Sequence, residues 1–318
     1  MNRTLTPEKS NTVNIISASR RTDIPRFYPR WFAERRKAGV AEFRNVFGGR
    51  GSVSLRYEDV LGYLFWTRFA RPFTPQLRVL RAEGIPFVFQ YTINGYGREI
   101  EPHSPALVKA IDDFQATSSL LPSNLCIQWR YDPIVLSNRY PPDWHLENFT
   151  LIAVSLKGAT RVVNTSFIEP YKKAIRRVGD TSVLFRPIDE QRHKSVAKSR
   201  NILEVSFKEG RTLLEQLAAI AQSHDMELRM CSNPEWDILP AAQCCGIELF
   251  APYGEEITNR VNSLRPGPSR ASCRCVKTVD IGMDNTCPAG CKYCYVVTAQ
   301  ETAMKNFRMH QPMSSMLR

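Results

Sequence analysis

Short runs of β-branched and aromatic residues alternate along the chain with stretches in which apolar residues recur at helical spacing. In one such stretch, 211–222, the residues Leu213, Leu214, Leu217 and Ile220 fall on a single helix face. Strands that alternate with helices favour parallel pairing, because each helix returns the chain to the same edge of the sheet. The strand candidates are the runs 13–18, 41–47, 60–66, 86–93, 125–131, 160–167, 226–230 and 276–281.

The number of strand and helix units indicates the fold class. Eight units in roughly 280 residues predict an α/β fold, a (β/α)8 barrel of the TIM type. A flattened or incomplete barrel is the alternative, because short strands are hard to assign and 41–47 is the weakest candidate. No repeat or glycine-serine linker divides the chain. We therefore expect one barrel domain over 13–308, a disordered tail over 1–12, and a tail over 309–318 that frays.

Polar residues gather where the predicted strands end. In a parallel barrel the carboxyl ends of the strands form the active site, so these side chains would face one pocket. Each of them alone is as well explained by a helix cap or a buried rim residue. Together they indicate a polar, anion-tolerant pocket ringed by arginine and aromatic groups. They are Ser17, Ser19, Arg20, Arg21, Thr22, Asp23, Trp66, Thr67, Arg68, Gln90, Tyr91, Thr92, Asn94, Trp129, Arg130, Tyr131, Asp132, Pro133, Ser166, Cys231 and Asp280.

Composition excludes several classes of protein. With 43% hydrophobic residues among 318, the chain is too apolar for a disordered protein. The residues 1–13 lack the apolar core of a secretory signal, and no apolar stretch reaches the ~20 residues of a membrane span. We therefore expect a cytoplasmic protein without a membrane partner. A formal net charge of +12 favours anionic partners, such as nucleic acid, nucleotides or phosphorylated metabolites.

Several common catalytic signatures are missing from the sequence. The five histidines form no H-x3-H or H-E-x2-H pattern, so a zinc hydrolase is unsupported. Neither a phosphate-binding G-x4-G-K-[ST] loop nor a G-x-S-x-G nucleophile elbow occurs. The chemistry therefore has to come from other residues, and the nine cysteines are the first candidates, because cysteines in a reducing compartment more often bind metals or catalyse than form disulfides.

Three cysteines follow the last predicted strand at C-x3-C-x2-C spacing. Cys287, Cys291 and Cys294 supply three thiolates on one short loop. In a four-iron, four-sulfur cluster each iron normally takes one cysteine, so three cysteines leave one iron open for chemistry. Zinc is the alternative, although most zinc sites use four ligands in two C-x2-C pairs.

This loop, with Tyr293 before its third cysteine, resembles the cluster loop of the radical S-adenosylmethionine superfamily, whose fold is a full or partial (β/α) barrel. The resemblance implies a [4Fe-4S] cluster and S-adenosylmethionine as cofactors. It implies that the methionine group chelates the open iron and that reductive cleavage yields a 5′-deoxyadenosyl radical. The superfamily carries the loop after the first strand, so this chain looks circularly permuted. Since the last strand of a closed barrel lies beside the first, the loop can still occupy the same position in space.

Nearly the whole chain, from about residue 15 to residue 295, also resembles the bacterial family called domain of unknown function 1848, or DUF1848. Two departures from the family pattern are Arg68 with Phe69, where a lysine and an asparagine are expected, and Asp284, where an aromatic residue is expected. Either could alter substrate contacts while leaving the cluster loop intact. The resemblance supplies no reaction or substrate. The motifs that carry it are 17–25, 65–67, 90–92, 129–134, 280–282 and 285–287.

The superfamily resemblance also suggests cofactor-binding residues. Tyr293 would lie near the adenine. The methionine carboxylate and the ribose would be bound from neighbouring strand ends, where a guanidinium can hold a carboxylate through two parallel hydrogen bonds. For Arg130 and Asp132 a mutual ion pair is an equally good interpretation. The candidates at these strand ends are Arg20, Arg21, Thr67, Arg130 and Asp132.

A second group of cysteines precedes the last strand. We interpret Cys231, one of the pair Cys244 and Cys245 (with Cys245 as the first choice), Cys273 and Cys275 as an auxiliary iron-sulfur cluster or a structural zinc site. Ordinary buried thiols are the alternative, because free cysteine is among the most buried residue types. Cys126 lies within a predicted strand, and we assign it to the core.

The sequence therefore predicts an iron-sulfur enzyme that cleaves S-adenosylmethionine and uses the radical on an unknown, anionic or nucleic-acid substrate. Such an enzyme needs a reductant such as flavodoxin or ferredoxin. The alternative is a nucleic-acid-binding protein that zinc stabilises and that carries out no radical chemistry. The net charge fits both, but the polar strand ends favour the enzyme, and no RNA-binding or recognition-helix motif supports the alternative.

Overall fold

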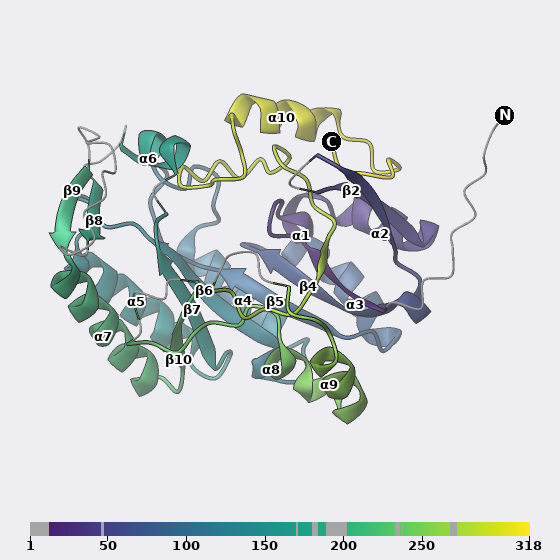
Figure 1. Ribbon diagram of the computed structural model, residues 1–318, viewed down its shortest axis with the longest axis horizontal. Helices are drawn as coiled ribbons and strands as arrows, with labels where there is room; N and C mark the ends of the chain where they lie inside the picture. Colours follow the sequence, from purple (N-terminus) through teal and green to yellow (C-terminus); the bar gives the residue numbers. More distant parts are fainter. Residues whose placement is uncertain are drawn as a thin grey trace.

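The computed structural model describes residues 13–45, 48–169, 171–179, 184–188, 202–232, 236, 238–267 and 272–318, with the backbone alone at 184–188 and 202–206. Their main feature is a parallel sheet of seven strands in the order β10-β7-β6-β5-β4-β1-β11 (Figure 1). Each strand overlaps one predicted run, so the α/β class and parallel pairing are confirmed. The strands are β1 (Asn14–Ala18), β4 (Val60–Thr67), β5 (Phe87–Thr92), β6 (Ile127–Ile134), β7 (Val162–Phe167), β10 (Glu227–Met230) and β11 (Val279–Asp280).

The strands follow one another across the sheet in chain order from β1 to β10, and β11 then adds on the other side of β1, where Ile16 pairs with Val279 and Ser17 with Asp280. This is the order of strands around a barrel, and it brings the last strand beside the first, as the permuted arrangement requires. Within the described residues, however, β10 and β11 do not pair, so the sheet is open and a closed eight-stranded barrel is not observed.

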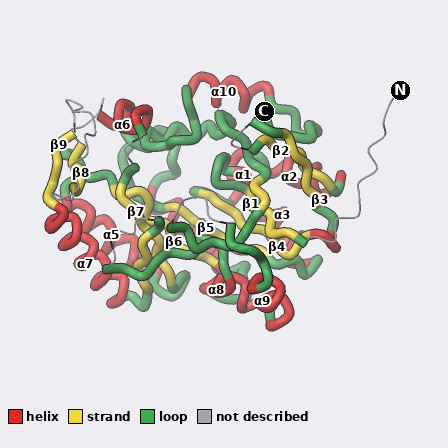
Figure 2. The backbone as a smooth tube through the Cα atoms, in the orientation of Figure 1, coloured by secondary structure: helices red, strands yellow, loops and turns green. Residues whose placement is uncertain are grey.

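The missing eighth strand is the run 41–47, whose prediction as a strand of the main sheet is wrong. Its described part forms β2 (Val40–Arg44), which pairs antiparallel with β3 (Arg50–Ser54) in a separate hairpin. Gly48, at φ +87°, lets the chain reverse there, because that conformation is strained for residues with a Cβ. A further parallel pair, β8 (Leu184–Ile188) with β9 (Ile202–Ser206), was not predicted. Figure 2 shows the two pairs at opposite ends of the molecule.

Helices cover both faces of the main sheet. The apolar positions of the predicted stretch 211–222 lie within α7, where Leu213, Leu214 and Leu217 are buried, so that helix is confirmed. One core is shared by the helices between successive strands, and a smaller one lies under α8 and α9 on the opposite face. The helices are α1 (Ile24–Phe27), α2 (Pro29–Ala38), α3 (Thr74–Ala82), α4 (Leu107–Ser118), α5 (Pro142–Leu156), α6 (Lys172–Gly179), α7 (Phe207–Ser223), α8 (Ile247–Phe250), α9 (Glu255–Asn262) and α10 (Gln300–Met309).

Alternation along the strands sorts the side chains between these two cores. On β5, Phe87, Phe89 and Tyr91 join the larger core, and Val88 between them joins the smaller one. The Tyr91 hydroxyl donates to Asp113 Oδ2 on α4 at 2.5 Å, so the polar tip of this buried ring is satisfied. Each face therefore contributes apolar side chains to a core, as expected for a parallel sheet covered on each side.

His145 gives the fold a pH dependence that can be measured. The ring is fully buried on α5, with Nδ1 2.8 Å from Tyr131 Oη and Nε2 3.3 Å from the carbonyl of Val135. Burial lowers the pKa of His145 from 6.5 to about 4. Between these values the unfolded chain binds a proton that the native state does not, so stability is lost as the pH falls. We expect this group alone to lower the free energy of unfolding by about 2 kcal/mol from pH 7 to pH 5.

Urea unfolding of the wild-type protein and of His145→Gln at these two pH values tests this expectation. Glutamine keeps a polar group at the site but does not titrate, so the variant should lose about 2 kcal/mol less than the wild type over the interval. Equal losses in the two proteins would show that His145 does not control this part of the pH dependence.

The segment after α10 does not fray, and the prediction of a frayed tail over 309–318 is wrong. Trp31 Nε1 on α2 donates to the carbonyl of Ser314 at 2.9 Å, and Arg35 on the same helix donates to the carbonyl of Met313 at 2.8 Å. Leu317 is fully buried. These contacts with α2 fix the position of the segment, although its polar sequence by itself predicts a frayed tail. The predicted disordered tail, 1–12, lies outside the described residues.

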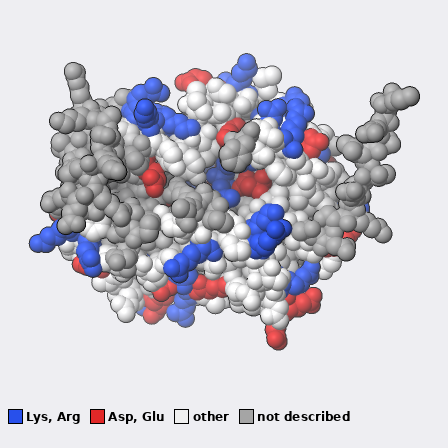
Figure 3. Space-filling model, in the orientation of Figure 1, with Lys and Arg blue, Asp and Glu red and all other residues white. Residues whose placement is uncertain are grey.

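Charged residues are spread over the surface. In the view of Figure 3 the lysines and arginines form separate groups with acidic and uncharged residues between them. Some basic residues are engaged within the fold: on α2, Arg35 is buried, and Arg36 forms an ion pair with Glu83. Among the described helices, none has the length and apolar character that a bilayer crossing requires.

Candidate functional site

The face of the main sheet that carries α8 and α9 turns polar toward the carboxyl ends of its strands. On β5, Gln90 is two residues after Val88 and points to the same face. Its Nε2 donates to Gln128 Oε1 on β6 at 2.6 Å, and Asn164 Nδ2 on β7 donates to the same oxygen at 2.7 Å. All three amides are buried. A hydrogen-bonded polar layer therefore crosses three strands on this face.

Asp280, the last residue of β11, holds the first strand and the last strand together. Its Oδ2 accepts hydrogen bonds from Ser17 Oγ and the backbone N–H of Arg20, both at 2.9 Å. Its Oδ1 accepts from Ser19 Oγ at 2.6 Å and from Arg21 Nε at 3.3 Å. The side chain of Arg21 is largely buried, whereas that of Arg20 is 34% exposed. Of the two predicted arginines, Arg20 is therefore the better placed to reach a bound ligand.

Thr67, another predicted ligand-binding residue, supports the loop after β1 instead of facing open space. Its hydroxyl donates to Asp23 Oδ1 at 2.7 Å, and the backbone N–H of Arg68 donates to Asp23 Oδ2 at 3.0 Å. Asp23 also caps α1 by accepting from the N–H of Arg26 at 3.1 Å. Burial raises the pKa of Asp23, and these hydrogen bonds oppose that effect. The end of β4 is thus fastened to the β1–α1 connection.

The segment that leads into the cysteine loop packs against the same β1–α1 connection. Thr22 Oγ1 donates to the carbonyl of Met283 at 2.9 Å, and Tyr28 Oη donates to the carbonyl of Thr286 at 2.5 Å. The Cys287 thiol interacts with the backbone of Asp23. The first cysteine of the loop therefore lies beside the end of β1, although Asp23 and Cys287 are 264 positions apart in the sequence. The two meet because β11, which precedes the loop, pairs with β1.

The second and third cysteines of the loop lie close to the first. The pKa of the Cys287 thiol is raised to about 12 and that of Cys291 to about 11. Burial is the main cause, and the next thiol of the loop, Cys291 and Cys294 respectively, contributes to each rise. Gly290 adopts φ +76°, and a Cβ there would lie 3.2 Å from Cδ2 of His103. The tight turn before Cys291 therefore requires glycine. Figure 1 shows this C-terminal segment, in yellow, crossing between α6 and α10.

A buried charged network supports the loop from the side of β4 and β5. Arg68 Nη1 lies 2.9 Å from Glu101 Oε1, and Asn94 Nδ2 donates to the same oxygen at 3.1 Å. The Tyr293 hydroxyl donates to Glu101 and accepts from Arg68. Glu101 is only 2% exposed. The nearby Arg68 guanidinium also opposes the rise in the pKa of Cys291. This network joins the strand ends to the cysteine loop.

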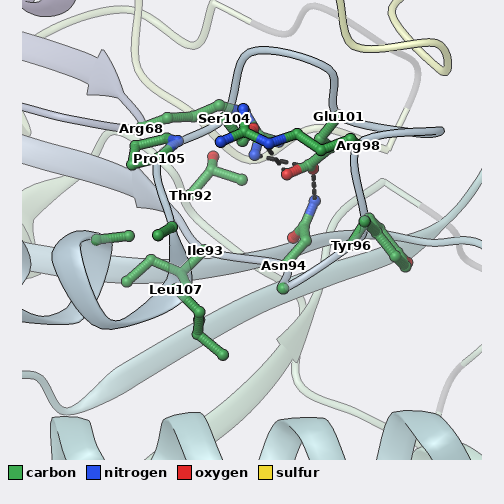
Figure 4. Close-up of a pocket in the computed structure, with 14 residues that line it drawn as sticks. Arg68, Thr92, Ile93, Asn94, Tyr96, Arg98, Glu101, Ser104, Pro105 and Leu107 are labelled. Atoms are coloured by element: carbon green, nitrogen blue, oxygen red, sulfur yellow. Dashed lines mark hydrogen bonds and ion pairs between the residues drawn. The ribbon is translucent and has the colours of Figure 1, made fainter.

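A cavity of about 200 Å³ adjoins the network. Figure 4 shows Glu101 at its edge, with its carboxylate directed toward Arg68 and Asn94. Ser104 Oγ donates to the other oxygen of Glu101 at 2.8 Å. The cavity therefore has a polar, charged edge next to the loop, and its remaining wall comes from the connection between β5 and α4. Its polar lining residues include Arg68, Thr92, Asn94, Arg98, Glu101 and Ser104.

Arg130 and Asp132, both predicted to bind the cofactor, form an ion pair with each other at the end of β6. This is the alternative that the sequence left open. The Arg130 guanidinium lies 5.0 Å from the centre of the Trp66 ring, and its Nη1 donates to Cys244 Sγ at 3.2 Å. Asp132 accepts a hydrogen bond from Ser166 on β7. Both residues are thus held in place by neighbouring strands.

The second group of cysteines lies on the same polar face. Side-chain interactions relate the thiols of Cys231 and Cys244, of Cys244 and Cys275, and of Cys275 and Cys273. Cys245, the first choice from the sequence, points into the smaller apolar core instead. Burial raises the pKa of the Cys245 thiol, and the neighbouring thiols of Cys275, Cys244 and Cys273 raise it further, so Cys245 lies close to the group. Cys244 is the member of the pair whose thiol interacts directly with Cys231, Cys275 and Arg130.

Two residues of the site were not assigned a role from the sequence. Arg68 was noted among the polar residues at the strand ends and as a departure from a family pattern, and Glu101 was not noted at all. Glu101 belongs to the connection after β5 and carries no motif, so only its position after a predicted strand could have indicated it. The other departure, Asp284, lies 3.5 Å from Arg21. Both departures are therefore tied to neighbouring parts of the site.

The chemistry of the loop fits an iron-sulfur cluster. Thiolates are the ligands of such clusters, and the three thiols are neighbours on one loop. In the part of the chain that the structure describes, no three or more His, Cys, Asp or Glu side chains are grouped so that they could hold one metal ion. A four-iron cluster binds each thiolate at a different iron, so it requires neighbouring thiols and not convergence on one point.

Comparison with known proteins identifies a family. A family model described as "Domain of unknown function (DUF1848)" matches residues 15–296. Searches among curated proteins and among solved structures gave no match. The matched range contains the main sheet, the charged network and all three cysteines of the loop.

Proposed function

The chain belongs to the DUF1848 family, as its motifs predicted, and we propose that it is an iron-sulfur enzyme that reductively cleaves S-adenosylmethionine. The observation that carries this proposal is the position of the loop with Cys287, Cys291 and Cys294. The loop follows β11, which pairs with β1, and it lies against the polar carboxyl ends of a parallel sheet. In folds of this kind the carboxyl ends of the strands carry the chemistry.

The three cysteines of the loop would hold a [4Fe-4S] cluster and leave one iron without a protein ligand. When bound, such a cluster supplies an electron that cleaves the sulfonium of S-adenosylmethionine to methionine and a 5′-deoxyadenosyl radical. The protein then has to orient the cofactor, present a substrate hydrogen and exclude water. Cys287 and Cys291 are already partly buried, which favours the exclusion of water.

The remaining predicted residues divide into ligand-binding and positioning roles. Arg20, with its partly exposed guanidinium, is our candidate for the methionine carboxylate, because a guanidinium can bind both carboxylate oxygens. Arg21 and Thr67 are positioning residues, since they hold Asp280 and Asp23 in the connections around the loop. Tyr293 remains the candidate for the adenine side, where its hydroxyl network fixes the orientation of the ring.

Arg130 and Asp132 would act as a pair. Each neutralises the charge of the other in a buried site, so neither needs a ligand for charge balance. We propose that they shape the polar face of the sheet and do not bind the methionine carboxylate directly. Their contacts with Trp66 and Ser166 fix this part of the site across β4, β6 and β7.

The substrate of this reaction remains an anionic or nucleic-acid molecule in our proposal. The net charge of +12 favours such a partner, and the cavity beside the loop is lined by Arg68 and Arg98. The electron would come from a reductant such as flavodoxin or ferredoxin. A cytoplasmic location would suit this chemistry, because thiolates and reductants both require a reducing compartment.

Cleavage of S-adenosylmethionine by anaerobically purified and reconstituted protein tests the proposal. After reduction with dithionite we expect 5′-deoxyadenosine, detected by chromatography, together with bound iron and sulfide. Protein that contains zinc and no iron, and that forms no 5′-deoxyadenosine after reconstitution, would overturn the proposal. That result would favour the zinc-stabilised nucleic-acid-binding protein. Steeply salt-dependent binding to random DNA or RNA would then support the alternative.

A further inference from the structure

Four thiols from three separate segments meet on the polar face of the sheet. Cys231 directly follows β10, Cys244 precedes α8, and Cys273 with Cys275 precede β11. We propose that these four cysteines bind a second iron-sulfur cluster, which is separate from the one proposed for the loop at 287–294. This inference does not depend on the cleavage of S-adenosylmethionine.

The contacts among the four thiols form a continuous chain. The thiol of Cys231 interacts with that of Cys244, Cys244 with Cys275, and Cys275 with Cys273. Cys231 and Cys273 are 42 positions apart in the sequence, and the thiols of Cys244 and Cys275 link them. These four cysteines come from distant segments, and no single sequence motif contains them. The fold itself therefore brings these ligands together.

Backbone hydrogen bonds hold the three segments in place. The N–H of Ala242 donates to the carbonyl of Met230 at 2.8 Å and ties the segment before α8 to the end of β10. The N–H of Val276 donates to the carbonyl of Cys245 at 3.0 Å and ties the segment before β11 to the same stretch. Gln90 also donates to the carbonyl of Cys244 at 3.0 Å. The thiol positions are therefore fixed by the backbone as well as by their own contacts.

Arg130 provides an independent reason to regard this group as a ligand set. Its Nη1 donates to Cys244 Sγ at 3.2 Å in a buried site. A neutral thiol is only a weak acceptor, whereas a metal-bound thiolate carries negative charge that a guanidinium stabilises. Hydrogen bonds to the sulfur ligands are a common feature of iron-sulfur sites and tune their reduction potentials. Arg130 is therefore placed to serve a thiolate ligand at Cys244.

The arrangement favours a cluster over a single zinc ion. Zinc requires four ligands that converge on one point, each about 2.3 Å from the metal when the ligand is a thiolate. Among the residues that the structure describes, no three or more His, Cys, Asp or Glu side chains are grouped so that they could hold one metal ion. An iron-sulfur cluster binds its thiolates at different irons, so the ligands have to be neighbours but need not converge on one point. The four thiols therefore suit a cluster better than a single zinc ion.

Iron counting on reconstituted variants tests the second site. We expect the wild-type protein to hold about eight iron atoms per chain, or about six if the second cluster has two irons. The variant Cys244→Ala should lose the second cluster and retain about four iron atoms in the loop. The triple variant Cys287→Ala, Cys291→Ala, Cys294→Ala should retain only the iron of the second cluster. Cys245→Ala is the matched control, because it removes the adjacent buried thiol and should keep the wild-type iron content.

The outcomes separate this inference from the proposed function. If the wild type holds about four iron atoms and the triple variant holds none, the second cluster does not exist while the loop cluster stands. If the triple variant keeps all of the iron and Cys244→Ala loses it, the second site stands and the loop cluster fails. About one zinc per chain that is lost in Cys244→Ala but kept in Cys245→Ala would also overturn the inference, since it would identify a structural zinc site.

Discussion

Replacing Cys291 by alanine is expected to abolish the formation of 5′-deoxyadenosine from S-adenosylmethionine. Cys291 is the middle ligand of the proposed loop cluster, and its partly buried thiol lies near Arg68. With two thiolates left, the loop cannot retain a four-iron cluster, and the reaction loses the cofactor that supplies its chemistry. Chromatography after dithionite reduction should give the background of a reaction without protein, and the iron content should fall by about four atoms per chain.

Cys126→Ala is the control for this variant. Cys126 is also a buried cysteine, but it belongs to the smaller apolar core, and burial raises the pKa of its thiol to about 12. Its removal should leave both the iron content and the product unchanged. If Cys291→Ala forms 5′-deoxyadenosine at the wild-type rate, the loop does not hold the reactive cluster, and the proposed function is wrong.

Replacing Arg68 by alanine is expected to lower the free energy of unfolding by about 3 kcal/mol, because removal of one partner leaves the other charge buried and unpaired. Arg68 Nη1 lies 2.9 Å from Glu101 Oε1, and the two side chains are 12% and 2% exposed. Asn94, Ser104 and Tyr293 still donate to Glu101 in the variant, but no positive charge remains to balance it. Urea unfolding measures the change.

The double variant Arg68→Ala, Glu101→Gln separates charge from packing. Neutral glutamine no longer requires a cation, so the double variant should be more stable than Arg68→Ala alone by at least about 1 kcal/mol. Arg68→Lys should retain part of the stability, because lysine keeps the charge but not the geometry of the guanidinium. If Arg68→Ala unfolds at the wild-type urea concentration, the ion pair does not contribute to stability.

The candidate site shows how far spacing can predict contacts. Cys287, Cys291 and Cys294 lie within eight residues of one another, so the sequence itself keeps them together. Arg68 and Glu101 are 33 positions apart in different connections, and no pattern links them. Their pairing arises because β4 and β5 are neighbours in the sheet and the connections that follow them meet at one edge. The sequence therefore indicated Arg68, Asn94 and Tyr293 as site residues, but it could not predict that they meet at Glu101.

The choice between Cys244 and Cys245 has a similar cause. Both residues have the same side chain, and adjacent positions differ only in the direction in which they point. That direction depends on how the segment before α8 is fixed against β10 and against the segment before β11. The same reasoning applies to Arg130, whose ion pair with Asp132 and contact with Cys244 depend on which residues face it across the sheet.

The sequence by itself determined the parallel α/β class, seven strands of the main sheet and the cysteine loop after the last of them, because these features depend on local periodicity and spacing. The tertiary structure alone decided that 41–47 contributes to a hairpin, that the sheet stays open between β10 and β11, and that the segment after α10 packs on α2. These outcomes depend on partners far away in the chain. Hydrogen bonds and buried contacts between distant segments select them, and periodicity carries no information about which segments will meet.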